Sequence, residues 1–332
     1  MAALDPAGSS IGAQIRRIAL TLALAMGALS AGAQSYPERP IRFIVAYPAG
    51  GGADLIARAV GQKLGEAWGQ QVVVDNRPGG GANIGAELAA RAAPDGYTLF
   101  ELTQTHSVNA TLYPKLGYDP LRDFTAVILM ATIPNVLVVH PSVPVHSTRE
   151  LIDYARARPG VLNYASTGSG GPQHLGAELF KTMSGVQITH IPYKGAAPAL
   201  TDLLGGQVQC MFGNMLSTLP HIRTGKLRAL AVSSAKRSRA SPQTPTVAES
   251  GLPGFESGSW FGIHIPAKTP RAIVDKLNAE VNRVLALPEL RERLGADGAE
   301  LVGGTPAEFD AFLRREIGKW AKVIKFTGMR VE

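Results

Sequence analysis

The sequence predicts an α/β protein of two lobes, each built on a mainly parallel sheet flanked by helices. The chain has 332 residues, about twice the length of a common domain, so it can form two hydrophobic cores. Short β-rich runs alternate with runs whose apolar residues are spaced as in a helix. This order is typical of parallel strands joined by helices.

The first elements repeat one unit, which is a strand, a glycine-rich loop and a helix. The unit is predicted twice, with a strand at 41–46, a loop at 47–52 and a helix at 54–64, then a strand at 72–74, a loop at 77–81 and a helix that ends near residue 92. A further strand follows at 97–100. Such units place several loops at one edge of a sheet.

The middle of the chain continues this pattern. Ser147 and Glu150 form a capping box for a helix that ends at Arg158. The predicted elements after it are a strand at 162–165, a loop at 166–172, a helix that carries His174, a strand at 188–191, a loop at 192–195 and a helix at 197–204. Four junctions between a strand and a helix, near Gly50, Gly79, Thr167 and Gly195, are therefore expected.

Two helices are predicted after residue 268. Thr269 and Thr305 are each expected to cap a helix with proline at its first position, and Thr305 and Glu308 form a second capping box. The longer helix, residues 306–326, has an amphipathic stripe that is expected to pack on the first sheet.

That packing predicts one lobe from both ends of the chain. Lobe 1 is expected to comprise residues 34–135 and 256–332, and lobe 2 residues 136–255. The apolar runs 136–139 and 227–232 are expected to be buried strands near the two crossing points.

Composition excludes several classes of protein. Hydrophobic residues make up 45% of the chain and charged residues 18%, which excludes an intrinsically disordered protein. The single cysteine, Cys210, excludes an internal disulfide, and no histidine pattern indicates a metal, so no cofactor is expected. The net charge is +7, but the densest basic run, residues 226–239, contains no aromatic residue to stack on bases. We therefore expect a solvated basic surface and no nucleic-acid partner.

The N-terminus has the order of a secretory signal. Arg16 and Arg17 precede an apolar run at 18–29, and small residues at 31–33 suit a signal peptidase. The run is shorter than the roughly 20 apolar residues that a membrane-spanning helix needs. We predict a signal peptide at residues 1–33, a mature chain that begins near Gln34, and a periplasmic location.

The four junctions predict an anion site, because backbone N–H groups and the helix dipole converge where a glycine loop opens a helix. A small carboxylate in a cleft between the lobes is the expected ligand. The alternative at each junction is a plain tight turn. A nucleotide is disfavoured because the glycine spacing after Gly79 departs from G-x-G-x-x-G and no Gly-Lys-Ser/Thr is present.

A hydrolase is the alternative from another class, since Ser166, Thr167, Ser169 and His174 cluster in one junction. The segment does not match G-x-S-x-G, because Thr167 stands where the first glycine belongs. His174 is interpreted either as a residue that packs against the loop or as a ligand contact. Asp54 has a similar second interpretation, as a cap of the first helix.

Five segments of the chain form a distinctive set: Tyr36–Val45, Pro48–Asp54, Asn76–Gly80, Pro94–Leu99 and Ile191–Gly195. Together they resemble the Bug-type receptors of tripartite tricarboxylate transporters. The resemblance covers the whole mature chain. It implies the two-lobed periplasmic-binding-protein fold, which closes like a flytrap on a small mono- or dicarboxylate, and delivery of that acid to membrane permease subunits. It implies no reaction, and we expect a monomer.

The resemblance also implies which residues bind the ligand. The loops 48–54 and 166–174 match the segments that grip ligand carboxylates in this family, and the stretches around Thr105 and Tyr193 match neighbouring cleft segments. The predicted ligand-binding residues are Pro48, Gly50, Gly51, Asp54, Thr105, His106, Ser166, Thr167, Gly168, His174, Tyr193, Gly195 and Ala196. The chain departs from the family pattern at Gly213, where members often have aspartate, and at Ala49, where the usual Pro-Pro-Gly-Gly of the first loop reads Pro-Ala-Gly-Gly. Glu101 is also unusual, because it places an acid near the cleft in a segment that is typically small and neutral. A same-fold receptor used for signalling remains an alternative.

Overall fold

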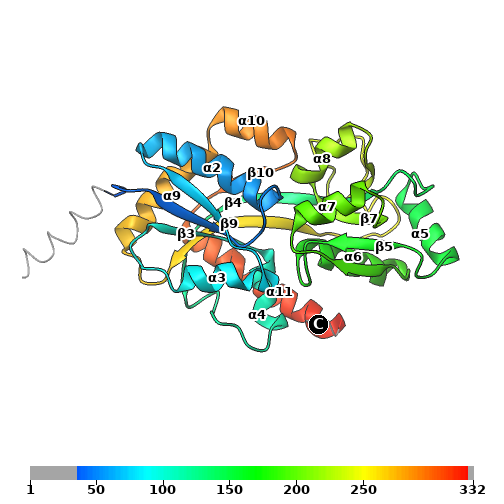
Figure 1. Cartoon of the computed structure of the whole chain (residues 1–332), viewed down its shortest axis with the longest axis horizontal. Helices are drawn as coiled ribbons and strands as arrows, with labels where there is room; N and C mark the ends of the chain where they lie inside the picture. Colours follow the sequence, from blue (N-terminus) through cyan, green and yellow to red (C-terminus); the bar gives the residue numbers. More distant parts are fainter. Residues whose placement is uncertain (1–35, 328–332) are drawn as a thin grey trace, which may run out of the picture.

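The computed structural model describes residues 36–327, so the predicted signal peptide at 1–33 lies outside the described residues. The described chain forms two lobes that are joined by a pair of strands running between them (Figure 1). Within residues 36–327, no helix is long and apolar enough to cross a membrane.

Lobe 1 contains the strands at one end of the sheet, in the order β2-β1-β3-β9-β4, with β10 beside β4. The first three strands are parallel, whereas β9 and β10 are antiparallel to their neighbours. The elements of this part are β1 (Ile41–Val45), α2 (Gly52–Trp68), β2 (Val72–Asn76), α3 (Asn83–Ala90), β3 (Thr98–Thr103), α4 (Gln104–Leu112), β9 (Gly258–Pro266), α9 (Arg271–Leu285), α10 (Pro288–Ala296), β10 (Glu300–Gly303) and α11 (Pro306–Thr327).

Lobe 2 contains the other strands, in the order β4-β7-β5-β6, with β8 also paired to β4. The strands β5, β6 and β7 are parallel, as predicted. The elements of this part are α5 (Thr148–Ala157), β5 (Asn163–Ser166), α6 (Pro172–Ser184), β6 (Thr189–Pro192), α7 (Ala196–Leu204), β7 (Cys210–Asn214), α8 (Met215–Arg223) and β8 (Arg228–Val232).

The strand β4 (Phe124–Val139) belongs to both lobes. Up to Pro134 it pairs with β9, and from Asn135 onward it pairs with β7 and β8. The predicted strand at 136–139 is therefore the end of a much longer strand, and the predicted strand at 227–232 is β8, directly beside it. The interlobe connection is thus a continuous piece of sheet and not a flexible linker.

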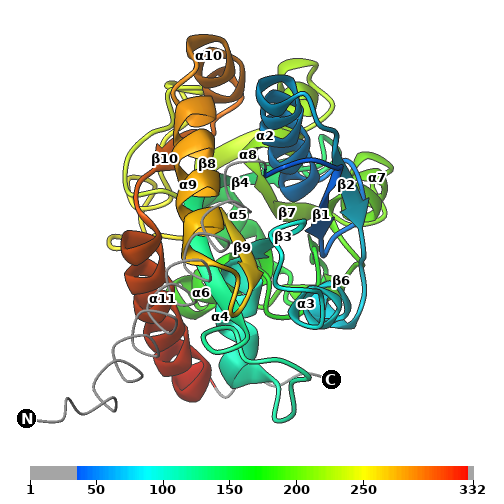
Figure 2. The same cartoon turned by 90° about the vertical axis from the view of Figure 1, so that its left-hand side faces the viewer.

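The long C-terminal helix packs on the first sheet, as predicted. Phe309 and Phe312 of α11 contact the ring of Trp260 on β9, with centroids 6.0 and 5.2 Å apart. Figure 2 shows α11 running beside α4. Farther along, Trp320 and Ile324 cluster with Leu175 of α6, so the same helix also reaches lobe 2.

Helix caps follow the local sequence with one exception. The backbone N–H of Glu150 donates to Ser147 Oγ over 3.1 Å, and Thr305 and Glu308 exchange bonds as a capping box. The expected cap at Thr269 is wrong, because α9 begins at Arg271 with Pro270 in the cap position. The hydroxyl of Thr269 instead donates to the carbonyl of Pro266, which ends β9.

Candidate functional site

Two neighbouring chambers lie between the lobes. The inner chamber has a volume of about 40 Å³, enough for a few waters or one small polar group. The outer chamber has a volume of about 380 Å³. Tyr47 and Thr167 line both chambers and so lie between them.

The inner chamber is lined by residues from both lobes and from the connecting strand β9. Its walls are Tyr47, Gly51, Gly52, Ala53, Thr103, Gln104, Thr167, Pro172, Gln173, Ala196, Asn214, Ser259, Trp260 and Phe261. Among these described residues there is no lysine or arginine. An anion in this chamber would therefore depend on backbone dipoles and neutral donors for its stabilisation.

Five helices begin at the inner chamber, namely α2, α4, α6, α7 and α8. The helices α4 and α8 have side-chain caps, because His106 with Thr103 closes the first and Asn214 Oδ1 accepts from Leu216 N in the second. The N-caps of α2, α6 and α7 are Gly51, Gly171 and Gly195, which contribute no side-chain hydrogen bond. First-turn N–H groups of these three helices are available to a ligand.

The lobes touch each other across the chamber through glycines. A Cβ added at Gly51 would lie 3.2 Å from Ala196 Cβ, and one at Gly52 would lie 2.6 Å from Asn214 Oδ1. A Cβ at Gly195 would lie 2.5 Å from Pro48 Cδ. At these points the two lobes lie so close that an added Cβ would be crowded by the opposite lobe. The lobes are therefore in a closed arrangement.

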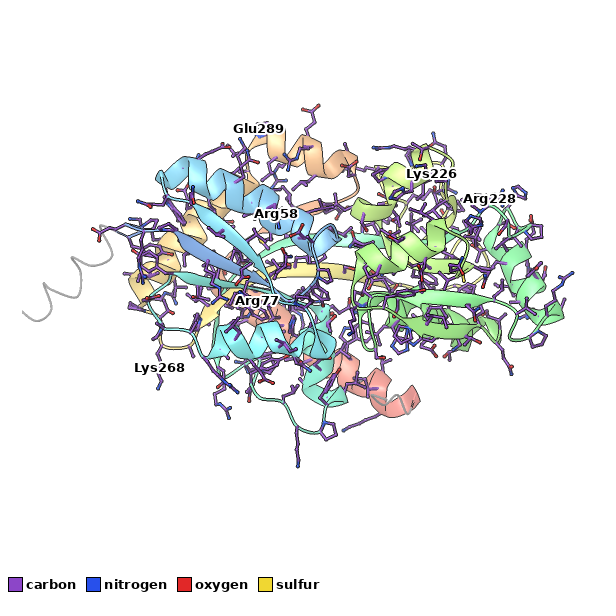
Figure 3. All side chains as sticks on the ribbon, in the orientation of Figure 1. Arg58, Arg77, Lys226, Arg228, Lys268 and Glu289 are labelled. Carbon is purple, nitrogen blue, oxygen red and sulfur yellow. The ribbon has the colours of Figure 1, made fainter. Side chains whose placement is uncertain are left out.

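The loop that precedes α2 is held from behind by Asp54. Its carboxylate accepts from Gly50 N, Arg58 Nε and Asn76 Nδ2, each over 3.0 Å. Arg58, labelled on α2 in Figure 3, also forms an ion pair with it at 2.9 Å. Burial alone would raise the pKa of Asp54, but these hydrogen bonds and the charge of Arg58 outweigh it and lower that pKa. Asp54 lines neither chamber and acts here as a support of the loop.

The loop that precedes α6 is held by imidazoles. His174 Nδ1 accepts from Gly170 N over 3.0 Å, and His190 Nε2 lies 2.6 Å from Ser166 Oγ. The two imidazole rings stack with centroids 4.1 Å apart. Burial is the main cause that lowers the pKa of His190 to about 4 and that lowers the pKa of His174. Both rings are therefore neutral at neutral pH.

Tyr47 and Thr167 are the two residues that line both chambers. The Tyr47 hydroxyl donates to Thr105 Oγ1 over 2.7 Å and lies 3.0 Å from Thr103 Oγ1. Burial raises the pKa of Tyr47 to about 12, so the phenol stays neutral. The Thr167 hydroxyl donates to Gln173 Oε1 over 2.6 Å.

The structure brings together seven of the thirteen predicted site residues on the chamber walls: Gly51, Thr167 and Ala196 on the inner chamber, and Pro48, Thr105, Thr167, Gly168 and Tyr193 on the outer one. The others stand behind the walls, and they are Gly50, Asp54, His106, Ser166, His174 and Gly195. His106 accepts from Thr103 N and so caps α4. Ser166 is fully buried and lines neither chamber, which places its contact with His190 away from any bound molecule.

Sequence reasoning missed Tyr47, Gln104, Asn214 and the β9 segment Ser259–Phe261. Asn214 had a usable signal, since asparagine before an apolar run is a common N-cap. Tyr47 lies in the predicted loop at 47–52, where the glycines and not the aromatic residue indicate a site. The β9 segment has no local signal of a site, because its position depends on pairing with β3 and β4.

Comparison with known proteins gives a consistent result. Residues 56–329 match the model of the tripartite tricarboxylate transporter family receptor. The chain is 39% identical over 317 residues to protein BugT of Bordetella pertussis, which covers 95% of this chain and 97% of BugT.

Two solved structures with bound ligands are also similar. Rpa4515 of R. palustris, described with adipate, has a TM-score of 0.87 and 42% identity, covering 90% of this chain and 100% of that one. MatC from Rhodopseudomonas palustris, described with bound malate, has a TM-score of 0.82 and 33% identity, covering 87% of this chain and 100% of that one.

Proposed function

The chain belongs to the tripartite tricarboxylate transporter receptor family, of the Bug type, and from that premise we propose that it captures a small organic carboxylate between its lobes and delivers it to the membrane permease of such a transporter. The family consists of solute-binding receptors, so the chain is a binding protein and not an enzyme. The two-lobed fold is the one in which such receptors close on a solute.

The observation that carries this proposal is the set of three glycine-capped helices that meet at the inner chamber. The helix α2 comes from lobe 1, and α6 and α7 come from lobe 2. Their dipoles and free N–H groups favour one negative group that both lobes hold at once. A carboxylate in the inner chamber would thus link binding to lobe closure.

The outer chamber gives room for the rest of the ligand. Its volume is about 380 Å³, against about 40 Å³ for the inner one, and its lining includes Pro48, Thr105, Gly168, Tyr193 and Lys194. Lys194 is the cation on this wall and suits a second carboxylate. Because two relatives are described with adipate and malate, we propose a dicarboxylate of similar size as the ligand of this chain.

The lobe boundaries and the cellular location belong to the same proposal. The change of partners in β4 between Pro134 and Asn135 supports a boundary near residue 136, and Phe255 still belongs to the core of lobe 2, which supports a return near residue 256. The basic, apolar and small residues at 16–33 support export and a periplasmic location. A sensing role through another membrane protein remains the second candidate.

The proposal is tested by thermal melting with a panel of acids. The panel comprises straight-chain dicarboxylates from succinate to suberate, together with malate and benzoate, and glucose and AMP serve as controls. A bound acid at one hundred times its dissociation constant should stabilise the protein by about 2.7 kcal/mol. Small-angle scattering with the best acid should show a more compact particle. Stabilisation by glucose or AMP with none from any acid would exclude the carboxylate function.

A further inference from the structure

Glu101 is a buried acid that the binding site described so far does not use. It lies on β3 with no exposed surface, and neither of its carboxyl oxygens has a hydrogen-bond partner among the described residues. No ion pair within residues 36–327 involves it either. A buried carboxyl without partners is costly when ionised, so its presence in a strand of the core needs an explanation.

Its position is directly beneath the inner chamber. Side chains alternate along a strand, so Glu101 points to the same face of β3 as Thr103, which lines the chamber, about 7 Å away along the strand. On the neighbouring strand, Glu101 pairs with Ile263 and Thr103 pairs with Phe261, another lining residue. Thr103 and Phe261 form part of the floor of the inner chamber, and Glu101 is the next residue of β3 on the same face, beneath that floor.

The charged and titratable groups on this side are few. From α2, Asp54 is close enough to raise the pKa of Glu101, and Arg58 is already paired with Asp54. Tyr47, in the loop after β1, is close enough for the charge of Glu101 to contribute to its raised pKa. The histidines His106 and His264 contact the rings of Phe100 and Phe124, on the opposite face of the sheet. No cation of the described chain thus faces Glu101 to balance its negative charge.

We propose that Glu101 is a specificity-determining residue of the carboxylate site, whose neutral form lets the inner chamber accept an anion and whose ionised form repels it. This inference rests on the proposed function. Glu101 does not line the chamber, so it acts through its charge and not as a ligand contact.

The electrostatics favour the neutral form. Burial first, and the charge of Asp54 second, hold the pKa of Glu101 well above its usual value. A carboxylate bound just above would raise that pKa further, and by reciprocity the proton strengthens binding of the carboxylate. Binding should therefore take up protons at a pH where Glu101 is partly ionised in the free protein.

The test is calorimetry with the acid of the panel that binds most tightly, from about pH 6, where aliphatic carboxylates are ionised, to about pH 9.5. In the wild type, affinity should fall by up to about tenfold per pH unit once Glu101 ionises in the free protein. Glu101→Gln, which keeps the shape and removes the titration, should bind as tightly as the wild type at low pH and show no such fall. Glu292→Gln, at an exposed position on α10, should keep the wild-type profile.

The outcomes separate this inference from the proposed function. If an acid binds but the wild-type affinity does not change with pH, or the Glu101→Gln profile falls like that of the wild type, Glu101 has no such role and the receptor function stands. If no acid binds at any pH, both fail. An infrared measurement on the wild type tests the inference even if Glu101→Gln does not fold. At neutral pH the ligand-free wild type should show the carbonyl stretch of a protonated buried carboxyl. The absence of that band would overturn the inference.

Discussion

The loops that open α2 in lobe 1 and α6 in lobe 2 have the same architecture but different supports. Each follows a parallel strand, each ends in a glycine N-cap, and each presents backbone N–H groups to the inner chamber. The first is held by the ionised Asp54 with Arg58 and Asn76. The second is held by the neutral imidazoles of His174 and His190.

This difference shows that the surface offered to a ligand and the chemistry that supports it are separable. Backbone donors at a helix start depend on the turn and on glycine, not on a particular polar side chain. The support behind the turn can be a carboxylate or an imidazole, provided that it accepts from a loop N–H group. Variants of the glycines should therefore change ligand binding, and variants of the supports should change stability and its pH dependence.

The largest effect is expected for Gly195→Ala in lobe 2. Gly195 has φ +126°, which strains any side chain, and the new Cβ would lie 2.5 Å from Pro48 Cδ across the cleft. The strain lowers the stability of the free and the bound protein alike, whereas the clash with the rigid Pro48 ring arises only when the lobes close. Affinity for the best acid should therefore fall about a hundredfold, the equivalent of roughly 2.8 kcal/mol. Calorimetry measures this loss.

Gly251→Ala is the matched control for that variant. Gly251 has φ +110°, but nothing lies within 4 Å of its added Cβ. This change should lower the melting temperature by backbone strain and leave affinity unaltered. Equal affinity in the two variants would mean that the contact between Gly195 and Pro48 has no part in ligand capture.

A smaller effect is expected for Gly52→Ala in lobe 1. Gly52 is the first residue of α2 and has no positive φ, so alanine causes no backbone strain and raises helix propensity. Its Cβ would nevertheless lie 2.6 Å from Asn214 Oδ1 in lobe 2. The ligand-free protein should melt at the same temperature or slightly higher, while affinity falls about tenfold, the equivalent of roughly 1.4 kcal/mol.

Gly295→Ala serves as the control here, since Gly295 lies inside α10 with nothing within 4 Å of an added Cβ. It should raise the melting temperature and leave binding intact. If Gly52→Ala also bound normally, the close approach of α2 and Asn214 would not be a requirement of the bound state.

The glycine-capped junctions could be predicted because their signals are local. Strand, loop and helix follow one another within a short stretch at β1–α2, β5–α6 and β6–α7, and each part carries its own propensity. The expected junction near Gly79 also exists, but its glycines line the outer chamber and not the inner one. Which junctions share a chamber depends on the closure of the lobes, which no local pattern contains.

The connecting strands show what local patterns could not predict. β4 crosses between two cores, so its pattern of burial is nearly continuous and does not indicate where one lobe ends. The residues Ser259 and Phe261 reach the chamber only because β9 pairs with β3 and β4, which lie far away in the sequence. The sequence marks Glu101 as an unusual acid near the cleft, but only that pairing places it beneath the inner chamber.

The smallest expected effect is a difference in acid sensitivity between the two loops. The folded-state pKa of His190 is lowered to about 4 and that of His174 is also lowered, so these groups contribute stability above the unfolded-state value of 6.5 that is lost as pH falls toward 4. The pKa of Asp54 is lowered from 3.8, so its contribution is lost only below that value. Between pH 6.5 and pH 4, acid should therefore weaken the lobe 2 loop and not the lobe 1 loop.

Thermal melting of three proteins between about pH 7 and about pH 4.5 tests this difference. His190→Phe keeps a ring that can stack between Tyr164 and His174 and removes one titrating group, so its stability should fall less steeply with acid than that of the wild type. Because His190 is partly exposed, solvent screening should keep the difference below about 1 kcal/mol. Asp54→Asn should melt lower at every pH in this range, since it loses the ion pair with Arg58, but with the wild-type slope. A wild-type slope in His190→Phe, or a shallower one in Asp54→Asn, would contradict this prediction, because of the two loop supports only the imidazoles change their proton occupancy on unfolding in this window.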